Sequence, residues 1–351
     1  MVLRRYTILT CVALVLAIIS FVSCDELPDG VEITDIPAYY YENNYLDGRV
    51  ETINKAIAEA SGNCETFFWI TDIHWEPDLN ARHSPALIKY IASKTGINKI
   101  LNGGDTGNSR IICENAISQL KNAIGSNRVY TVTGNHEIVD ATRYETPFER
   151  VADELRGHNS VIVYGDGNQS YFYFDNKEEK VRYIGLSSFG LYFNGDCEEA
   201  YTTEQLTWFT SEALKVDAGW SIIVFTHSLY YVNTVEQLTV VSGAQPFIDA
   251  IDHYNGSGNI ACVLMGHAHK DRIHIGETGV PYILSACDRY SPYHGDINVN
   301  RTLGTISEQH FEVVVIDKGK RLIKLLSVGA NARDGYDDNP GEEVDVRVVT
   351  Y

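Results

Sequence analysis

The stretch NGGDTG at residues 102–107 places a single carboxylate, Asp105, directly after two glycines. It follows residues 98–101, which we expect to form a strand, and glycine at this point permits backbone angles and close approaches that other residues resist. A carboxylate has two oxygens and can therefore bridge two metal ions. Asp105 is our candidate for the centre of a metal site at the end of a strand.

Four shorter motifs supply more residues of the kind that bind metals: DIH at residues 72–74, GNHE at 134–137, THS at 226–228 and GHAH at 266–269. Carboxylate, carboxamide and neutral imidazole are the usual ligands of zinc, manganese and iron. The candidate ligands are Asp72, His74, Asp105, Asn135, His227, His267 and His269. Each of them alone is more often a cap, a turn residue or a hydrogen-bonded core histidine, so their joint placement has to carry the argument.

Strands and helices are expected to alternate around the first three motifs. The sequence predicts strands at residues 66–71, 98–101 and 128–133, and helices at 84–94, with Ser84 as cap and Pro85 at its first position, 109–124 and 147–156. Such alternation implies parallel strands joined by crossovers, with ligands bound beyond the carboxyl ends of the strands. Asp72, Asp105 and Asn135 each follow one of these strands, which indicates an α/β fold with a site at the strand ends.

In the second half of the chain, a segment of antiparallel strands is expected first, and helices and strands follow it. Residues 161–188 contain aromatic runs divided by turn residues, which predicts antiparallel strands. Further on, the sequence predicts helices at 203–215 and 245–254, and strands at 220–225, 259–265, 272–275, 282–284, 311–316 and 321–326. His227 and His267 again follow expected strand ends and would join the same site.

The amino terminus has the plan of an export signal. Residues 1–23 contain two arginines, an apolar run and a small residue before the cut, as in a signal peptide. The sequence FVSC at residues 21–24 resembles a bacterial lipobox, in which Cys24 becomes the lipidated first residue; ordinary secretion and an uncleaved membrane anchor are the alternatives. Residues 24–48, acidic and rich in tyrosine, are expected to form a tether, and residues 49–351 a single domain that begins with a helix at 49–61.

The formal net charge of −19 argues against a broad electropositive surface for nucleic acid. An anionic substrate must therefore be attracted locally, and bound cations would supply the positive charge. Two cations about 3.5–4 Å apart would also lower the pKa of a shared water toward neutrality and screen the charge of a phosphoryl group. The chemistry that these residues indicate is metal-assisted hydrolysis.

Two residues of the GNHE motif are candidates for catalysis. His136 is adjacent to a candidate ligand, and its imidazole could protonate a leaving group or stabilise an oxyanion. Glu137 could orient and charge that imidazole. The alternatives are an outer contact to the metal site for His136 and a simple salt bridge for Glu137.

The five motifs, in this order, resemble the signature of the calcineurin-like metallophosphoesterase superfamily: D-x-H, G-D-x-x-D/E, G-N-H-D/E, H and G-H-x-H. The resemblance implies a four-layer α/β/β/α sandwich. It also implies that one metal is held by Asp72, His74, Asp105 and His269, and the other by Asp105, Asn135, His227 and His267. The resemblance further implies that a hydroxide bridging the two metals hydrolyses a phosphoester, and that His136 of this chain acts on the leaving group. The occurrence of all these motifs in this order argues against the alternative that the residues are only caps, turn residues or hydrogen-bonded core histidines.

Some features depart from the superfamily pattern. Asn108 stands where an acid is often found three positions after the bridging aspartate, which puts an outer contact in doubt but no ligand. No tyrosine follows Asp105 closely, so the tyrosine-ligated iron type of purple acid phosphatase is not expected. Export together with this signature is similar to the acid-sphingomyelinase-like branch, although the chain has no room for a saposin module.

We therefore expect an exported, membrane-tethered phosphoesterase of the cell envelope with two manganese, zinc or iron ions, acting on phosphomonoesters or phosphodiesters. Trp75, Tyr230 and Tyr231 follow candidate ligands and belong either to the substrate cleft or to the core. The alternative function is a non-catalytic surface protein that binds or scaffolds on a phosphoesterase fold. Such proteins usually lose metal ligands, and none is lost here.

Overall fold

The computed structural model describes residues 36–62, 64–75, 83–107, 110–137, 163–164, 171–193, 196–232, 238–289, 301–333 and 341–351. The chain divides into two units, residues 1–32 and 33–351, and all described residues belong to the second. The expected signal peptide, Cys24, the start of the tether and the helix expected at 147–156 lie outside the described residues. In the part of the chain that is described, no helix combines the length and apolar character needed to cross a membrane.

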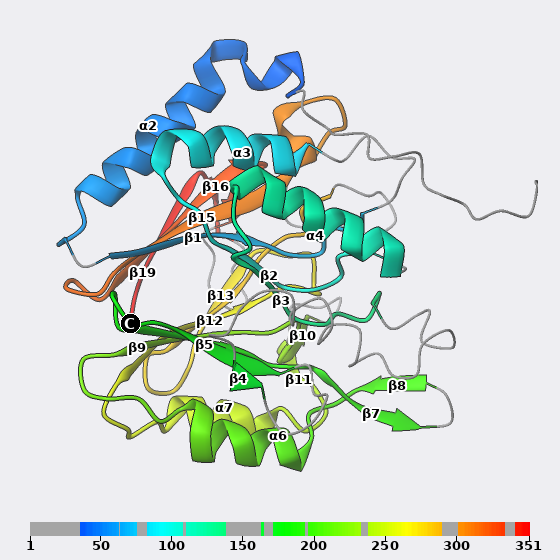
Figure 1. Ribbon diagram of the computed structural model, residues 1–351, viewed down its shortest axis with the longest axis vertical. Helices are drawn as coiled ribbons and strands as arrows, with labels where there is room; N and C mark the ends of the chain where they lie inside the picture. The colour runs from blue at the N-terminus through cyan, green and yellow to red at the C-terminus, as the bar shows by residue number, and fades with distance from the viewer. Residues whose placement is uncertain are drawn as a thin grey trace, which may run out of the picture. The chain divides into compact units, whose positions relative to one another are not determined.

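Two mixed β-sheets face each other in the second unit (Figure 1). The first sheet has the spatial order β19 (Val346–Thr350), β16 (Leu322–Gly329), β15 (His310–Asp317), β1 (Cys64–Ile70), β2 (Ile100–Asn102) and β3 (Val129–Thr131). The second has the order β13 (Arg272–Ile275), β14 (Pro281–Leu284), β12 (Asn259–Met265), β9 (Ser221–Phe225), β6 (Val181–Gly185), β5 (Phe172–Asn176) and β4 (Val163–Tyr164).

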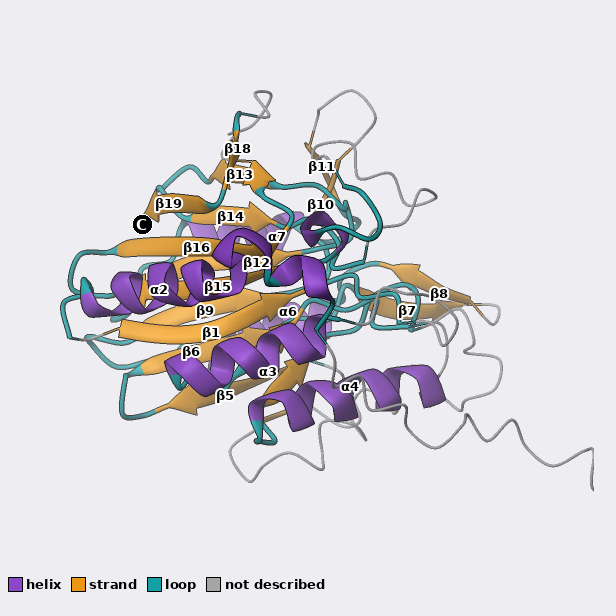
Figure 2. Ribbon diagram, turned by 90° about the horizontal axis from the view of Figure 1, so that it is seen from above, coloured by secondary structure: helices purple, strands orange, loops and turns teal. Residues whose placement is uncertain are grey.

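Helices cover the outer face of each sheet. The first sheet carries α2 (Tyr45–Ala58), α3 (Ser84–Thr95) and α4 (Arg110–Ile124), and Figure 2 shows α2 and α3 lying across its strands. The second sheet carries α6 (Thr203–Trp208), which continues as a π-helical turn over Phe209–Ala213, and α7 (Gln245–Asp252). The expected four-layer α/β/β/α sandwich is confirmed.

Strand direction brings the candidate motifs to one edge. In the first sheet β1, β2 and β3 are parallel, and in the second sheet β6, β9, β12 and β14 are parallel. The strands β4, β5 and β6 pair antiparallel, as the sequence predicted for residues 161–188. The motifs at residues 72–74, 102–107, 134–137, 226–228 and 266–269 all follow the carboxyl ends of parallel strands.

The strand β1 shows why its apolar run is continuous. Phe67 and Trp69 point into the core between the two sheets, whereas Phe68 and Ile70 point into the core under α2, α3 and α4. Both faces of the strand are therefore buried, and all four side chains are at most 1% exposed. A strand buried on both faces reads as an uninterrupted apolar segment.

The structure differs from the sequence predictions near the amino terminus. Residues of the expected tether form short 3-10 turns at Ala38–Tyr40 and Glu42–Asn44, and α2 begins at Tyr45, not at residue 49. Burial of Tyr40, whose hydroxyl donates to Gln309 Oε1 at 3.3 Å, explains the difference, because this contact joins residues distant in sequence.

Two further predictions were wrong or incomplete. Ser84 does not cap α3, since the N-cap is His83 and the Ser84 hydroxyl instead donates to Asp288 Oδ1 at 2.5 Å. The sequence did not reveal β19 or the hairpins formed by β7 (Phe189–Phe193) with β8 (Asp196–Glu199), β10 (Tyr230–Val232) with β11 (Leu238–Val240), and β17 (Ala332–Arg333) with β18 (Glu343–Val344). These strands are only two to five residues long, too short for a clear periodic pattern.

Candidate metal centre

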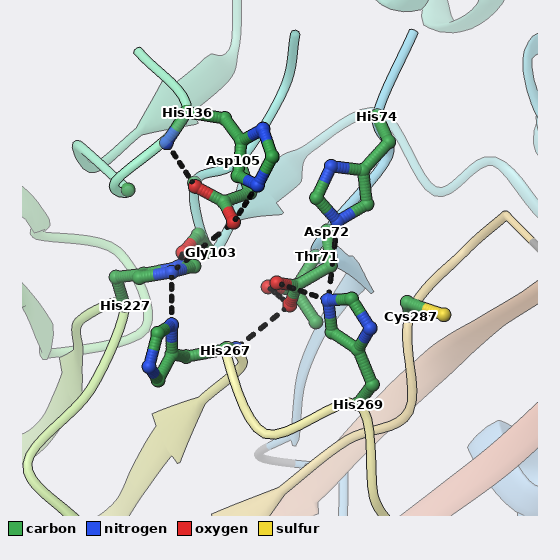
Figure 3. Close-up of polar contacts among 12 residues, drawn as sticks. Thr71, Asp72, His74, Gly103, Asp105, His136, His227, His267, His269 and Cys287 are labelled. Atoms are coloured by element: carbon green, nitrogen blue, oxygen red, sulfur yellow. Dashed lines mark hydrogen bonds and ion pairs between the residues drawn. The ribbon is translucent and has the colours of Figure 1, made fainter. Parts of the chain in front are cut away.

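The candidate ligands meet beyond the carboxyl ends of five strands. The loops after β1, β2, β3, β9 and β12 deliver them, and Figure 3 shows their side chains converging from opposite sides. Backbone hydrogen bonds tie the first two loops together: Asp72 N–H donates to Gly104 O and His74 N–H donates to Asp105 O, each at 2.9 Å. The site is therefore built on the rigid edge of the sandwich.

Five of the candidate ligands have a left-handed backbone. The φ angles are 52° at Asp72, 44° at His74, 51° at Asp105, 64° at His267 and 53° at His269. In an extended segment, residues two apart would send their side chains to opposite faces. The left-handed turns instead bring Asp72 and His74 to one point and turn both His267 and His269 into the site, at a cost of about 1–3 kcal/mol per residue that is typical of functional sites.

The first ligand group consists of Asp72, His74, Asp105 and His269, and all four side chains are buried. His269 Nε2 lies 3.1 Å from Asp72 Oδ1 and 3.1 Å from His74 Nε2. The other carboxylate oxygen of Asp72 is already occupied, because it accepts hydrogen bonds from the Thr71 hydroxyl at 2.7 Å and from His267 N–H at 2.9 Å. One oxygen of Asp72 is thus directed into the group.

The second ligand group consists of Asp105, Asn135, His227 and His267. Asn135 Oδ1 lies 3.2 Å from His227 Nε2 and 3.1 Å from His267 Nδ1, and these two nitrogens are 3.0 Å apart. The Nδ1 atom of His227 contacts the carbonyl oxygen of Gly103 at 2.8 Å. Since a carbonyl can only accept, His227 Nδ1 carries a proton, and Nε2 is the nitrogen turned into the group.

The donor atoms fit divalent cations. Ligands held at about 2.0–2.1 Å in a tetrahedral site lie about 3.3–3.4 Å from one another, close to the spacing found in both groups. A set of imidazole, carboxylate and amide donors suits zinc, manganese or iron, and Asp105, shared by both groups, can bridge two ions.

The pKa values show how the cluster holds charge without a cation. Burial lowers the pKa of His269, but the charge of Asp72 and the hydrogen bond between them outweigh burial and raise it to about 12. Burial raises the pKa of Asp72, but the charge of His269 prevails and holds it well below its usual range. Burial raises the pKa of Asp105 to about 7 against the charge of His227. At neutral pH a proton therefore occupies the place where a cation would bind.

Gly266 is required by the close approach of Asp72. A Cβ at this position would lie 1.9 Å from Thr71 Oγ1 and 2.3 Å from Asp72 Oδ2. These distances are far below van der Waals contact, and the atoms concerned are hydrogen-bonded to each other. The glycine of the GHAH motif therefore lets the end of β12 approach the loop after β1.

His136 lies at the solvent-facing side of the site. Its backbone N–H donates to Asp105 Oδ1 at 2.8 Å, and its ring packs edge-on against His74 with centroids 4.6 Å apart. The side chain is 23% exposed, and Asn135 and His267 are also only partly buried. Burial lowers the pKa of His136, although the charge of Glu137 opposes this shift. The imidazole is thus neutral at pH 7 and accessible to a substrate.

Glu137 has a place that the sequence did not indicate. Its carboxylate, 3% exposed, accepts the backbone N–H groups of Asp105 at 2.9 Å, Thr106 at 2.5 Å and Gly134 at 2.7 Å. It thereby joins the loop that carries Asp105 to the loop that carries Asn135. This geometry makes Glu137 a backbone anchor of the site, in addition to its charge effect on His136.

The tertiary structure adds outer contacts that no motif indicated: Gly103 O on His227, the Thr71 hydroxyl on Asp72, the Cys287 side chain on His269, and Arg289 Nη1 on the carbonyl oxygen of His74. Cys287 appears beside His269 in Figure 3.

Trp75 and Tyr230, two of the aromatic residues that follow candidate ligands, belong to the core. Trp75 is 5% exposed and packs under the helices of the first sheet. Tyr230 is 7% exposed and packs edge-on against Tyr282. The side chain of Tyr231 lies outside the described part of the chain. Of the two interpretations for Trp75 and Tyr230, core packing is the one observed.

Fold and site together define an α/β/β/α protein with two groups of side chains that could each hold a metal ion and that share one aspartate. The family model for calcineurin-like phosphoesterases matches residues 66–271, more than half of the chain. The protein belongs to this family, and the match includes every candidate ligand from Asp72 to His269.

The chain is similar to several solved structures at low sequence identity. A dimetal phosphatase from Danio rerio is 12% identical with a TM-score of 0.52, over 82% of this chain and 98% of the other. A 5'-nucleotidase from Candida albicans is 16% identical (TM-score 0.39, 72% of this chain, 52% of the other), and a phosphopantetheinyl hydrolase from Mycobacterium tuberculosis is 13% identical (TM-score 0.39, 66% and 91%). No curated protein sequence matches the chain.

Replacing Glu137 by glutamine is expected to loosen both loops. An amide has one acceptor oxygen, and its N–H₂ group would face backbone donors, so part of the buried N–H set loses its partner at a cost of about 1–3 kcal/mol. Metal affinity should fall about 10–100-fold. Urea unfolding and zinc titration measure the two effects, with Glu178→Gln, at an exposed position, as the control. Equal zinc affinity in both variants would contradict the anchoring role.

Metal binding is expected to release protons. Because the pKa of His269 is about 12 in the metal-free cluster, His269 is protonated at pH 7 and must lose that proton to become a ligand. Affinity should therefore rise with pH, by about tenfold per unit near neutrality. Calorimetric titration with zinc in buffers of different ionisation enthalpy should give at least about one proton released per chain. A heat independent of the buffer would contradict this, and the exposed His253→Gln variant should behave like the parent protein.

Proposed function

We propose that this protein is a dinuclear metal-dependent phosphoesterase that hydrolyses phosphomonoesters or phosphodiesters. One observation carries the proposal: two groups of donor side chains, at the ends of parallel strands, share Asp105. Membership of the calcineurin-like phosphoesterase family supports the reaction class. Seven potential ligands are all present, which favours an enzyme over a binding protein that has lost them.

Each ligand group would hold one ion. Asp72, His74 and His269 would bind the first and Asn135, His227 and His267 the second, with Asp105 common to both. When bound, the ions supply an activated water and a positive charge that attracts and screens the phosphoryl group. Manganese, zinc and iron all suit these donors.

His136 would act on the leaving group. The Nε2 atom of His136 lies 3.9 Å from Asp105 Oδ2, at the partly exposed edge of the site where a substrate can enter. Burial keeps its pKa below the usual range, so the free imidazole is neutral and presents one N–H donor at pH 7. The negative charge of a bound phosphoryl group would raise that pKa and so favour the imidazolium form, which can donate a proton to the departing oxygen.

The proposed place of action is the cell envelope. The signal-peptide plan of residues 1–23 and the lipobox-like FVSC at 21–24 support export and attachment to a membrane through a lipid on Cys24. The net charge of −19 makes a nucleic-acid partner an unsuitable alternative. The substrate would thus be a phosphoester met outside the cytoplasm.

Activity should depend on metal and on Asp105. The full chain, stripped with a chelator and reloaded with manganese or zinc, should hydrolyse a chromogenic phosphomonoester or the matching bis-ester only after reloading. Asp105→Asn should lower kcat/KM by at least about 10³-fold, since the change affects both ions. Asp217→Asn, at an exposed position, should leave the rate unchanged.

The preferred ester would then distinguish a monoesterase from a diesterase. Equal rates for the reloaded protein and Asp105→Asn on both esters would contradict the proposal and favour a binding or scaffolding protein. A metal content near two ions per chain with no hydrolysis would point instead to a narrow natural substrate.

Lipidation should depend on Cys24. Cells that express the protein and are fed radiolabelled palmitate should give a labelled protein in the membrane fraction, because the lipobox cysteine receives the lipid. Cys24→Ala should lose the label, whereas Cys11→Ala, within the signal segment, should keep it. An unlabelled parent protein would rule out the lipoprotein and leave secretion or an uncleaved anchor.

A further inference from the structure

Residues 285–289, the segment that follows β14, run behind the first ligand group. The Cys287 side chain hydrogen-bonds with His269, Asp288 N–H donates to Thr71 O at 2.9 Å, and Arg289 Nη1 donates to His74 O at 2.9 Å. The segment thus contacts two of the three loops that carry this group, the loops after β1 and β12. It also lies outside residues 66–271, the part that the family model matches.

Cys287 contacts the outer nitrogen of His269. Since His269 Nε2 faces Asp72 and His74, its Nδ1 is the atom turned toward Cys287, as Figure 3 shows. Cys287 is fully buried, and its thiol donates to Arg289 O at 3.0 Å. The thiol can therefore accept from His269 Nδ1–H. Such an outer hydrogen bond fixes which nitrogen of a histidine is free to bind metal.

Arg289 supports the neighbouring ligand. Its guanidinium donates to the carbonyl oxygen of His74, a residue held in the left-handed conformation with φ of 44°. Arg301 holds the segment itself, because its Nη1 and Nη2 donate to the carbonyl oxygens of Cys287 at 2.5 Å and Asp288 at 2.7 Å. Arg301 therefore fixes the backbone of the segment. The side chains of Cys287 and Arg289 in turn contact His269 and His74, two residues of the same ligand group.

The second ligand group takes its outer contacts from other parts of the chain. His227 Nδ1 meets the carbonyl oxygen of Gly103, and the backbone around Asn135 is held through Glu137 at Gly134 N–H. The two groups share Asp105 but rest on different supports. A change in residues 285–289 should therefore act on one ion more than on the other.

We propose that Cys287 and Arg289 are positioning residues that orient His269 and His74 and so set the affinity of the first metal ion separately from the second. The inference rests on the proposed function, because it needs the two ligand groups to bind metal. Residues 285–289, which lie outside the region that the family model matches, would thus control how tightly one of the two ions is bound.

Zinc titration of the full chain tests the proposal. The stripped parent protein should bind two ions per chain, by calorimetry and by elemental analysis after desalting. Cys287→Val, which removes the hydrogen bond and makes the side chain larger by about one methyl group, should weaken one site about 10–100-fold and leave the other unchanged. Arg289→Met should act on the same site, and Cys287→Ser, which restores a donor and an acceptor, should recover most of the affinity.

Cys262→Val is the matched control. Cys262 is a fully buried cysteine in the core between the sheets, so its replacement changes packing without touching an outer contact of the site. It should lower the unfolding temperature about as much as Cys287→Val while both ions bind as in the parent protein. Far-UV circular dichroism confirms that each variant is folded, and Cys287→Ser provides the comparison if the valine variant does not fold.

Two outcomes would overturn the inference: unchanged affinity at both sites in Cys287→Val and Arg289→Met, or equal weakening of both sites. A Cys287→Ser variant as weak as Cys287→Val would do so as well. These outcomes leave the proposed function intact as long as the parent protein binds two ions. A parent protein that binds no metal would instead remove the proposed function, and the inference with it.

Discussion

The convergence of polar side chains at one buried point is the constraint on which the rest of the structure depends. Asp72, His74, Asp105, His267 and His269 reach that point only through left-handed backbone conformations, which are unfavourable for residues other than glycine. Such conformations persist only where the surroundings determine them. Strands buried on both faces hold the loops at their bases, and the Glu137 carboxylate and the 285–289 segment hold them further out.

Charge balance explains why this point is suited to cations. Asp72, Asp105 and Glu137 are buried together in a protein of net charge −19, and a buried carboxylate requires compensation. Without metal, the compensation comes from a proton on His269 and from backbone N–H groups on Glu137. Cations that replace that proton would restore balance in the site and provide a local attraction for an anionic ester on an otherwise acidic protein.

Local sequence determined much of the fold and the identity of the site residues. The continuous apolar run at β1 and the alternation of strands with helices predicted an α/β fold, because burial on both faces leaves a direct trace in composition, whereas the four-layer sandwich was implied by the resemblance to the superfamily. Motifs directly after strand ends predicted the site, because the carboxyl ends of parallel strands meet at one edge. Metal-binding side chains must be of a few chemical types, so Asp72, Asp105 and His267 could be selected from the sequence.

Only the tertiary structure decided how these residues are held. Three contacts join residues that are distant along the chain. The Cys287 side chain hydrogen-bonds with His269, 18 positions away; the Arg289 guanidinium donates to His74 O, 215 positions away; and the Tyr40 hydroxyl donates to Gln309, 269 positions away. Periodicity and spacing describe neighbours in sequence, so they contain no information about such pairs. The motifs therefore identified the candidate ligands, while contacts across the folded chain determined their orientation and the placement of Glu137.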